Sequence, residues 1–444
     1  MAPAATLVAA LILGASLLAG TPAAVPTGGA ADAAAASAAD ATLTESINDV
    51  QVLVLKNTCD DACQADTVAQ AEAAGCDHVR LFPTLRMAAV RCAPAAARDG
   101  SVSADASSGG GVDLARLPGV ESTSPDAIVR TGSAAGGSAR VAVDGEPAAV
   151  RQAPSSVPWG LDRINQAALP LDGQADTSAC FPRRGAGVTV YVVDSGINAG
   201  HAQFEERASG VVAPGATYKT AEDLNGHGSH VAGTVAGKST GVAPAATVVG
   251  VRGSDAYGDA SIANLLSGIE YVAAIKTRDR RRKVVLNGSF GGDTPATVPW
   301  TVAAERAAAA GVIVAVAAGN DPVDACRNNP ARAAGVLTVA ALTEQDQLAS
   351  FSARGTRCVA AAAPGVGILS VDAFTPAGLK QLSGTSMASP HVAGLAALVL
   401  AEDPAGADLD AAEVLRRITR GAPTVGGYPL AWANPACGAA AGVN

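Results

Sequence analysis

The chain has 444 residues, a formal net charge of −9, and aromatic side chains at only 3% of its positions. This length allows a large buried core together with an accessory domain, and the core has to rely on small aliphatic side chains. The negative charge argues against a nucleic-acid-binding protein, as does the lack of a basic sequence patch interleaved with aromatic residues. One basic run, Lys276 to Lys283, falls between a helical pattern and a strand pattern, and we interpret it as a solvated loop.

The first 20 residues predict a secretory signal peptide. Ala5 to Gly20 form an apolar segment that is too short to span a membrane. Small residues and prolines follow it. Residues 21–47 are rich in Ala, Gly and Pro and predict a low-complexity segment without stable structure. The eight cysteines fit an oxidising compartment. We therefore expect a secreted, extracellular protein without a membrane partner.

Residues 48–130 predict a small α+β module. Val50 to Leu55 forms a strand pattern, Asp60 to Ala74 is helical in composition, and Leu85 to Arg91 forms a second strand pattern. Gly119 to Asp126 then predicts a turn followed by the start of a strand. The order of strand, helix and strand is that of a compact βαβ-like unit.

Half of the cysteines lie in this module, at Cys59, Cys63, Cys76 and Cys92. An oxidising compartment favours two disulfides, but the pairing among four cysteines cannot be read from a sequence. A zinc site is the alternative. We disfavour it because the module contains a single histidine, His78.

Residues 131–156 are rich in Gly, Ala, Ser and Pro, which predicts an exposed linker of the kind where proteolytic cleavage concentrates. From residue 157 the chain alternates apolar runs with helical segments, and uninterrupted apolar runs are typical of buried parallel strands. The predicted strands are Val188–Val193, Thr247–Val251, Val284–Leu286, Val312–Val316 and Val336–Ala340, and the predicted helices are Ser261–Thr277, Val302–Ala310 and Ala411–Arg420. This alternation predicts a doubly wound α/β domain with a mostly parallel sheet, helices on both faces, and an active site at the strands' carboxyl ends.

Ser386 lies where small, turn-forming residues run into an apolar helix pattern, within the stretch Leu382 to Gly394. At a helix N-terminus, unpaired backbone N–H groups and the helix dipole favour negative charge, which suits a serine whose attack creates an oxyanion. A serine at such a junction is more often a helix N-cap. The motif alone therefore does not identify a catalytic serine, and the interpretation depends on further motifs in the chain.

Two motifs upstream complete a pattern. Asp194 directly follows an apolar strand, and His227 stands between two glycines. His227 and His230 do not match the H-E-x-x-H zinc pattern, because no glutamate follows His227. Asp194, His227 and Ser386, in this order and each in a glycine-rich junction, resemble the subtilisin-like serine proteases, in particular the proteinase K and aqualysin branch. The order differs from the Ser, Asp, His of α/β-hydrolases.

The resemblance implies a role for each of these residues. Ser386 would be the nucleophile, and His227 would be the general base. Asp194 would hold the imidazole in one tautomer and stabilise the imidazolium. Asn320 matches the family's oxyanion-hole asparagine, which works with the backbone N–H of the nucleophile.

The resemblance also implies where the substrate binds. Two segments would hold it as an added strand. They consist of Gly258, Asp259 and Ala260, and of Ser289, Phe290 and Gly291. Ala317, Ala318 and Gly319 would form an apolar wall of the S1 pocket, with Asn328 near its base and no acidic residue apparent. A broad, neutral or apolar preference at P1 follows.

The module at 48–130 resembles the inhibitory propeptide of these proteases, and it ends in Pro125 and Asp126 as they do. The resemblance implies that residues 131–156 form a linker with the processing site and that residues 157–444 form the peptidase domain. We expect a zymogen whose own propeptide acts as intramolecular inhibitor and chaperone. The mature enzyme, starting between about Val150 and Ser156, would be a monomer acting on proteins and peptides.

Two further implications concern stability. Cys326 and Cys358 match a family disulfide, and Cys180 and Cys437 remain as a further pair. Relatives commonly hold a tight calcium ion with an aspartate that would fall at Ala360. Because a hard dication needs charged oxygen ligands, we expect no tight calcium there, and we expect no metal or other cofactor.

Together these observations predict a secreted serine endopeptidase. The alternative from another class is a non-catalytic protein that keeps the subtilisin fold for binding. We disfavour it because all four catalytic positions are present. An esterase on another fold is disfavoured by the order of the three catalytic motifs.

Overall fold

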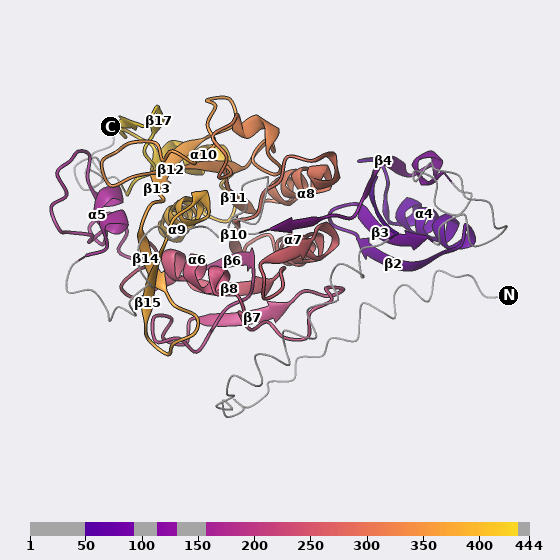
Figure 1. The fold of residues 1–444 in the computed structure, drawn as a ribbon, viewed down its shortest axis with the longest axis horizontal. Helices are drawn as coiled ribbons and strands as arrows, with labels where there is room; N and C mark the ends of the chain where they lie inside the picture. Colours follow the sequence, from indigo (N-terminus) through magenta and orange to yellow (C-terminus); the bar gives the residue numbers. More distant parts are fainter. Residues whose placement is uncertain (1–48, 93–112, 131–156, 434–444) are drawn as a thin grey trace. The chain divides into compact units, whose positions relative to one another are not determined.

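The computed structural model describes residues 49–92, 113–130 and 157–433, which Figure 1 draws as coloured ribbons. The predicted signal peptide, low-complexity segment and linker lie outside the described residues, and so does Cys437. The expectations for these parts stay predictions.

The N-terminal module contains an antiparallel sheet and a helix. Its elements are β1 (Val50–Leu55), α4 (Asp61–Ala73), β2 (Cys76–Phe82), β3 (Met87–Cys92), a short 3-10 turn (Leu114–Arg116) and β4 (Val120–Pro125), and the strand order is β2-β3-β1-β4. The Asp60 carboxylate caps α4 by accepting a hydrogen bond from the backbone N–H of Cys63 at 2.9 Å. The sequence analysis missed β2, because Asp77 and Arg80 interrupt its apolar run.

The four cysteines of this module form two disulfides, Cys59–Cys63 and Cys76–Cys92. Cys76 and Cys92 stand opposite each other on the neighbouring strands β2 and β3. The pairing that the sequence left open is therefore local within the module. The zinc-site alternative was wrong, because every sulfur that it would use is in a disulfide.

The C-terminal domain is built on a seven-stranded sheet. The strands, in their order across the sheet, are β13 (Ala361–Pro364), β12 (Leu337–Leu342), β11 (Ile313–Ala317), β10 (Lys283–Gly288), β6 (Val188–Asp194), β8 (Thr247–Arg252) and β7 (Ala208–Val212). All neighbouring strands pair in parallel. The predicted doubly wound parallel sheet is confirmed. The two edge strands were not predicted, since β13 contains mainly alanine and β7 is only partly buried.

Helices cover both faces of this sheet (Figure 1). Helices α6 (His227–Ala236) and α9 (Thr385–Glu402) pack on one face, and α7 (Ile262–Arg278) and α8 (Val298–Ala309) pack on the other. Neighbouring residues of β6 point to opposite faces, so Val192 packs with α6 and α9 whereas Val193 packs with α7. Both faces being buried explains the continuous apolar runs in the sequence.

Shorter elements complete the domain. They are α5 (Trp159–Asn165), β9 (Asp259–Ser261), the antiparallel pair β14 (Ile368–Val371) and β15 (Leu379–Leu382), α10 (Ala411–Ile418), and the pair β16 (Thr424–Val425) and β17 (Tyr428–Pro429). Within the described ranges, no helix is long and apolar enough to cross a membrane.

The basic run predicted as a solvated loop contains a buried lysine. The Lys276 side chain lies near the end of α7, and its ammonium group donates to the carbonyls of Arg280, Arg282 and Ala407 at 2.6–2.9 Å. Burial lowers the pKa of Lys276. The solvated-loop interpretation was wrong for this residue, because the carbonyl groups at the corner between α7 and β10 need a donor.

Cys326 and Cys358, which the family resemblance pairs, form a disulfide in the structure. It closes a sequence separation of 32 residues. Cys180 is also in a disulfide. Its predicted partner, Cys437, is outside the described residues, so that pairing stays a prediction.

Replacing both Cys326 and Cys358 by serine is expected to lower the free energy of unfolding by about 3 kcal/mol, because the unfolded chain regains the entropy of an open loop. Urea unfolding would measure the difference, with parent and variant both carrying Ser386→Ala to prevent self-digestion. A loss below about 1 kcal/mol would show that this disulfide contributes little to the fold.

Candidate active site

Asp194 and His227 meet at the carboxyl edge of the sheet. Asp194 is the last residue of β6, and His227 is the first residue of α6. The Asp194 side chain is fully buried, and its Oδ1 lies 2.8 Å from Nδ1 of His227. Since Nδ1 carries the proton donated to this carboxylate, Nε2 is left as the basic nitrogen of the ring. The geometry suits a histidine that acts as a proton acceptor.

Several charges act on His227. Burial lowers the pKa of His227, but the Asp194 carboxylate and its hydrogen bond raise it, and so does the charge of Asp223. The nearby ammonium of Lys380 lowers it. The net effect places the pKa of His227 above its ordinary value.

Sequence reasoning missed Asp223, which organises the turn before His227. Its buried carboxylate accepts hydrogen bonds from the backbone N–H groups of Gly226 at 2.6 Å and Ser229 at 2.8 Å. It also accepts one from the Ser195 hydroxyl at 2.8 Å. Asp223 therefore satisfies N–H groups at the start of α6 and links this turn to the residue after Asp194. The only sequence signal for this role of Asp223 is its position three residues before Gly226, which precedes His227.

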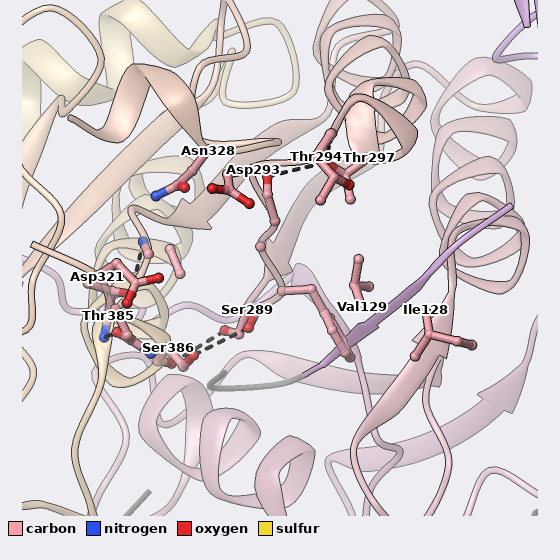
Figure 2. Close-up of a pocket in the computed structure, with 16 residues that line it drawn as sticks. Ile128, Val129, Ser289, Asp293, Thr294, Thr297, Asp321, Asn328, Thr385 and Ser386 are labelled. Atoms are coloured by element: carbon pink, nitrogen blue, oxygen red, sulfur yellow. Dashed lines mark hydrogen bonds between the residues drawn. The ribbon is translucent and has the colours of Figure 1, made fainter. Parts of the chain in front are cut away.

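Ser386 is the second residue of α9, so its backbone N–H belongs to the first turn, where helical partners are lacking. Its Oγ donates to the carbonyl of Ser289 at 3.3 Å, and Figure 2 shows these two serines side by side. Pro390 has no N–H for the carbonyl of Ser386, which instead accepts from the Ser289 hydroxyl at 3.3 Å. The proline thus allows a second connection between α9 and the segment that follows β10.

Asn320 is held in one orientation by Thr385. The Oδ1 of Asn320 accepts hydrogen bonds from the backbone N–H and from the hydroxyl of Thr385, both at 2.8 Å. Because the amide oxygen is used in this way, the NH₂ end of the side chain is the end that can donate to a ligand. Asn320, Thr385 and Ser386 all line one pocket.

That pocket also contains three of the four residues predicted for S1, together with the predicted strand-binding segment Ser289 to Gly291. Ser289, Phe290, Gly291, Ala317, Gly319 and Asn328 line it. Ala318 does not, because its side chain is fully buried and its backbone carbonyl accepts from Asn328 Nδ2 at 2.9 Å. The part of Ala318 in the S1 wall stays a prediction.

The pocket also contains two carboxylates that the sequence analysis did not place there. Asp293 and Asp321 both belong to its lining, and Figure 2 shows them around the same cavity as Ser386. The expectation of a pocket without an acidic residue was wrong. Both aspartates lie in loops after strands, where nothing in the local sequence reports which way a side chain points.

The predicted substrate edge is occupied by the chain itself. Strand β5 (Ile128–Arg130) of the N-terminal module pairs antiparallel with β9, with Val129 opposite Ala260. Val129 is buried in the same apolar cluster as Ile262 and Phe290. Ile128 and Val129 also line the pocket that contains Ser386. The edge of β9 therefore accepts an added strand, as the resemblance implies for a substrate.

Polar contacts with α7 and α8 hold the module in place. Glu270 on α7 accepts from the backbone N–H groups of Thr84 and Leu85 at 3.1 and 2.9 Å. Arg306 on α8 donates to the carbonyls of Leu55, Leu85 and Arg86 at 2.6–2.8 Å. Asp126 accepts from the backbone N–H of Ala263, at the start of α7, at 3.1 Å. Two of these three side chains bind main-chain groups of the module, and the module's Phe82 and Met87 side chains are buried in the same apolar cluster as residues of α7 and α8.

The remaining histidines near the site have structural surroundings. His230 and His391 are buried and hydrogen-bond to backbone carbonyls. Burial lowers the pKa of His230 to about 3 and that of His391 to about 4, so both are neutral at pH 7. Across the described residues, no group of three or more His, Cys, Asp or Glu side chains is arranged to hold a metal ion. The expected absence of calcium near Ala360 stays a prediction.

Comparison with known proteins identifies the family. A model of the Subtilase family matches residues 185–430, which is more than half of the chain. The chain belongs to the subtilase family. This part includes β6, α6, α9 and the pocket-lining residues from Ser289 to Ser386.

Individual subtilases support this assignment. The chain is 43% identical over 249 residues to the extracellular serine proteinase of Thermus sp. (strain Rt41A), which covers 55% of this chain and 57% of that protein. It is 41% identical over 255 residues to the cuticle-degrading serine protease of Arthrobotrys oligospora, with 56% of this chain and 60% of that protein covered. This chain thus spans a little over half the length of these curated relatives.

The fold agrees with a solved subtilase structure. The crystal structure of a cold adapted subtilisin-like serine proteinase matches with a TM-score of 0.55 and 35% identity, over 63% of this chain and 99% of that chain. The architecture is therefore subtilisin-like.

The charges around His227 predict a pH dependence. A general base acts only when neutral, so kcat/KM for a peptide anilide is expected to fall as the pH drops through the raised pKa of His227. Asp223→Asn keeps an oxygen acceptor but removes a charge that raises this pKa, so the acidic limb is expected to move to lower pH. Asp176→Asn, at an exposed carboxylate bonded to Ser178, serves as the control. An acidic limb that does not move in Asp223→Asn would contradict this account.

Proposed function

We propose that this chain is a secreted subtilisin-like serine endopeptidase, made as a zymogen that processes itself. The observation that supports the proposal best is the buried Asp194–His227 hydrogen bond, made by a helix that packs beside the helix bearing Ser386. The names of the extracellular relatives support secretion. The strand-binding edge and the pocket beside Ser386 support a peptide substrate.

In the proposed mechanism, Ser386 Oγ attacks the scissile carbonyl while Nε2 of His227 accepts its proton. The negative charge that develops on the carbonyl oxygen is stabilised by the backbone N–H of Ser386 and the NH₂ group of Asn320. His227 then gives the proton to the leaving amine, which leaves an acyl group on Ser386. A water molecule attacks this acyl group in the same way, with His227 as the base, and releases it. Asp194 keeps the imidazole in the required tautomer throughout.

Ser386 Oγ has to leave its hydrogen bond with the Ser289 carbonyl for this chemistry. That bond is long, at 3.3 Å, and weaker than the bond that it would make to a basic imidazole nitrogen. Catalytic hydrogen bonds commonly tighten only when substrate is bound. A turn of the Ser386 side chain toward His227 would therefore accompany binding.

For the residue before the scissile bond, we infer a neutral or apolar preference. Phe290, Ala317 and Gly319 offer an apolar surface with room for side chains of different shape. The carboxylates of Asp293 and Asp321 add a negative field to the same pocket, which disfavours acidic side chains through like-charge repulsion.

The pairing of β5 with β9 supports the proposal of self-processing. Strand β5 of the module pairs with β9, which is where a substrate strand would bind. The linker at 131–156 follows Arg130 in the sequence. A propeptide bound in this way blocks access to the site, so the module would inhibit the enzyme until it is cut and released. A monomeric enzyme would then act on peptides and proteins.

A non-catalytic binding protein with this fold is the alternative. Such a protein would not require a buried carboxylate on His227 or an asparagine oriented beside Ser386. The presence of both arrangements argues for catalysis.

Ser386→Ala is expected to abolish hydrolysis of a chromogenic peptide and to leave the secreted chain uncut, because it removes the nucleophile. N-terminal sequencing of the wild-type protein is expected to give a start between about Val150 and Ser156. Asn320→Ala is expected to process slowly and to lose about 10²–10³-fold in kcat with little change in KM, because its donor acts on the oxyanion. Unchanged hydrolysis in Ser386→Ala would refute the proposed function.

A further inference from the structure

A cation and an exposed aromatic ring lie next to the catalytic histidine. The Phe374 side chain is 64% exposed, the most exposed of the large apolar residues in the described part of the chain. The ammonium group of Lys380, on β15, lies 5.5 Å from the centroid of the Phe374 ring, within the range of a cation–π contact. The ring therefore holds the lysine side chain in a defined position.

The side chains of Lys380 and Phe374 both lie against Gly226, the residue before His227. A Cβ atom at Gly226 would lie 2.7 Å from Lys380 Nζ and 3.0 Å from Phe374 Cε2. Gly226 also has a φ of 93°, which L-residues with a side chain rarely adopt. Glycine thus meets two requirements here, and the lack of a side chain lets the Lys380 ammonium approach the backbone next to His227.

This cation lies on the leaving-group side of the proposed catalytic centre. The acyl part of a substrate is held by β9 and by the pocket at Ser386, and neither Lys380 nor Phe374 lines that pocket. His227 delivers its proton to the leaving amine, so the peptide after the scissile bond has to pass His227 and Gly226. Figure 1 shows β15 beside α6 on the side away from α7, whereas β5 binds β9 at the start of α7.

The charge of Lys380 is available to a substrate. Within the described ranges, no carboxylate forms a salt bridge with Lys380. Its side chain is only partly buried, so no large cost of desolvation offsets an interaction with a ligand. The charged groups facing His227 are Asp194, Asp223 and Lys380, and only Lys380 is positive.

We propose that Lys380 is a specificity-determining residue on the leaving-group side of the cleft, where it favours substrates with an acidic side chain in the first two residues after the scissile bond. The inference rests on the proposed endopeptidase function. It deepens that function by assigning a charge preference to a part of the substrate that the pocket at Ser386 does not contact.

The test uses internally quenched peptides that are identical except for Glu, Gln or Lys at the first or second position after the scissile bond. The wild-type enzyme is expected to favour Glu over Lys by about three- to tenfold in kcat/KM at one or both positions, and the ratio should shrink in 1 M salt. Lys380→Gln is expected to bring the ratio close to one, and Lys380→Glu is expected to reverse it. The ratio is measured within each enzyme, so a general loss of activity in a variant cancels.

Lys238→Gln is the matched control, since Lys238 is an exposed lysine paired with Glu205. It is expected to keep the wild-type ratio. A Glu-to-Lys ratio that is the same in Lys380→Glu as in the wild type would overturn the inference and leave the proposed function intact. A wild-type enzyme that cleaves none of the peptides would instead refute the proposed function, and the inference with it.

Discussion

The hydrogen bond between the buried carboxylate of Asp194 and Nδ1 of His227 is the interaction on which the rest of the site depends. A carboxylate without solvent contact is costly unless it is paired, so this bond constrains both partners. Asp194 ends the interior strand β6, and His227 begins α6, which packs on the same sheet. The continuous apolar run of β6, which is buried on both faces of the sheet, thereby fixes the position and the tautomer of a proton acceptor.

The same sheet positions the groups that would handle substrate. Asn320 follows β11, Ser289 follows β10, and β9 follows β8, so all three lie at the carboxyl edge where parallel strands end. The N-terminal module uses that edge through β5 and is held by Glu270 and Arg306. Because β5 pairs with β9 along the main chain, this edge accepts an extended strand, as the proposed peptide substrate requires.

Local patterns predicted much of this arrangement. The parallel strands were found from their apolar runs, and Asp194, His227, Ser386 and Asn320 were found because each stands in a short motif at an element boundary. Their roles stay proposals. Other features arise from contacts between distant segments, which no local pattern reports. Strand β2 was missed because Asp77 and Arg80 interrupt its apolar run.

The same limit applies to the charges around the site. Asp293 and Asp321 enter one pocket from two loops. Lys380 reaches Gly226 although more than a hundred residues separate them in the chain. Asp223 is closer in sequence to His227, but it also accepts a hydrogen bond from the hydroxyl of Ser195, 28 residues before it. The sequence gives the positions of these residues in the chain, but their neighbours in space depend on the folded structure.

Labelling with a sulfonyl fluoride, a reagent that modifies activated serine hydroxyls, tests the central claim most directly. The account predicts one adduct per processed chain, located on Ser386 by mass spectrometry of the digested protein. It also predicts that His227→Ala loses the adduct, because the hydroxyl is then without its base. Labelling of Ser386 at the same rate in His227→Ala, or an adduct at a different serine, would contradict the account.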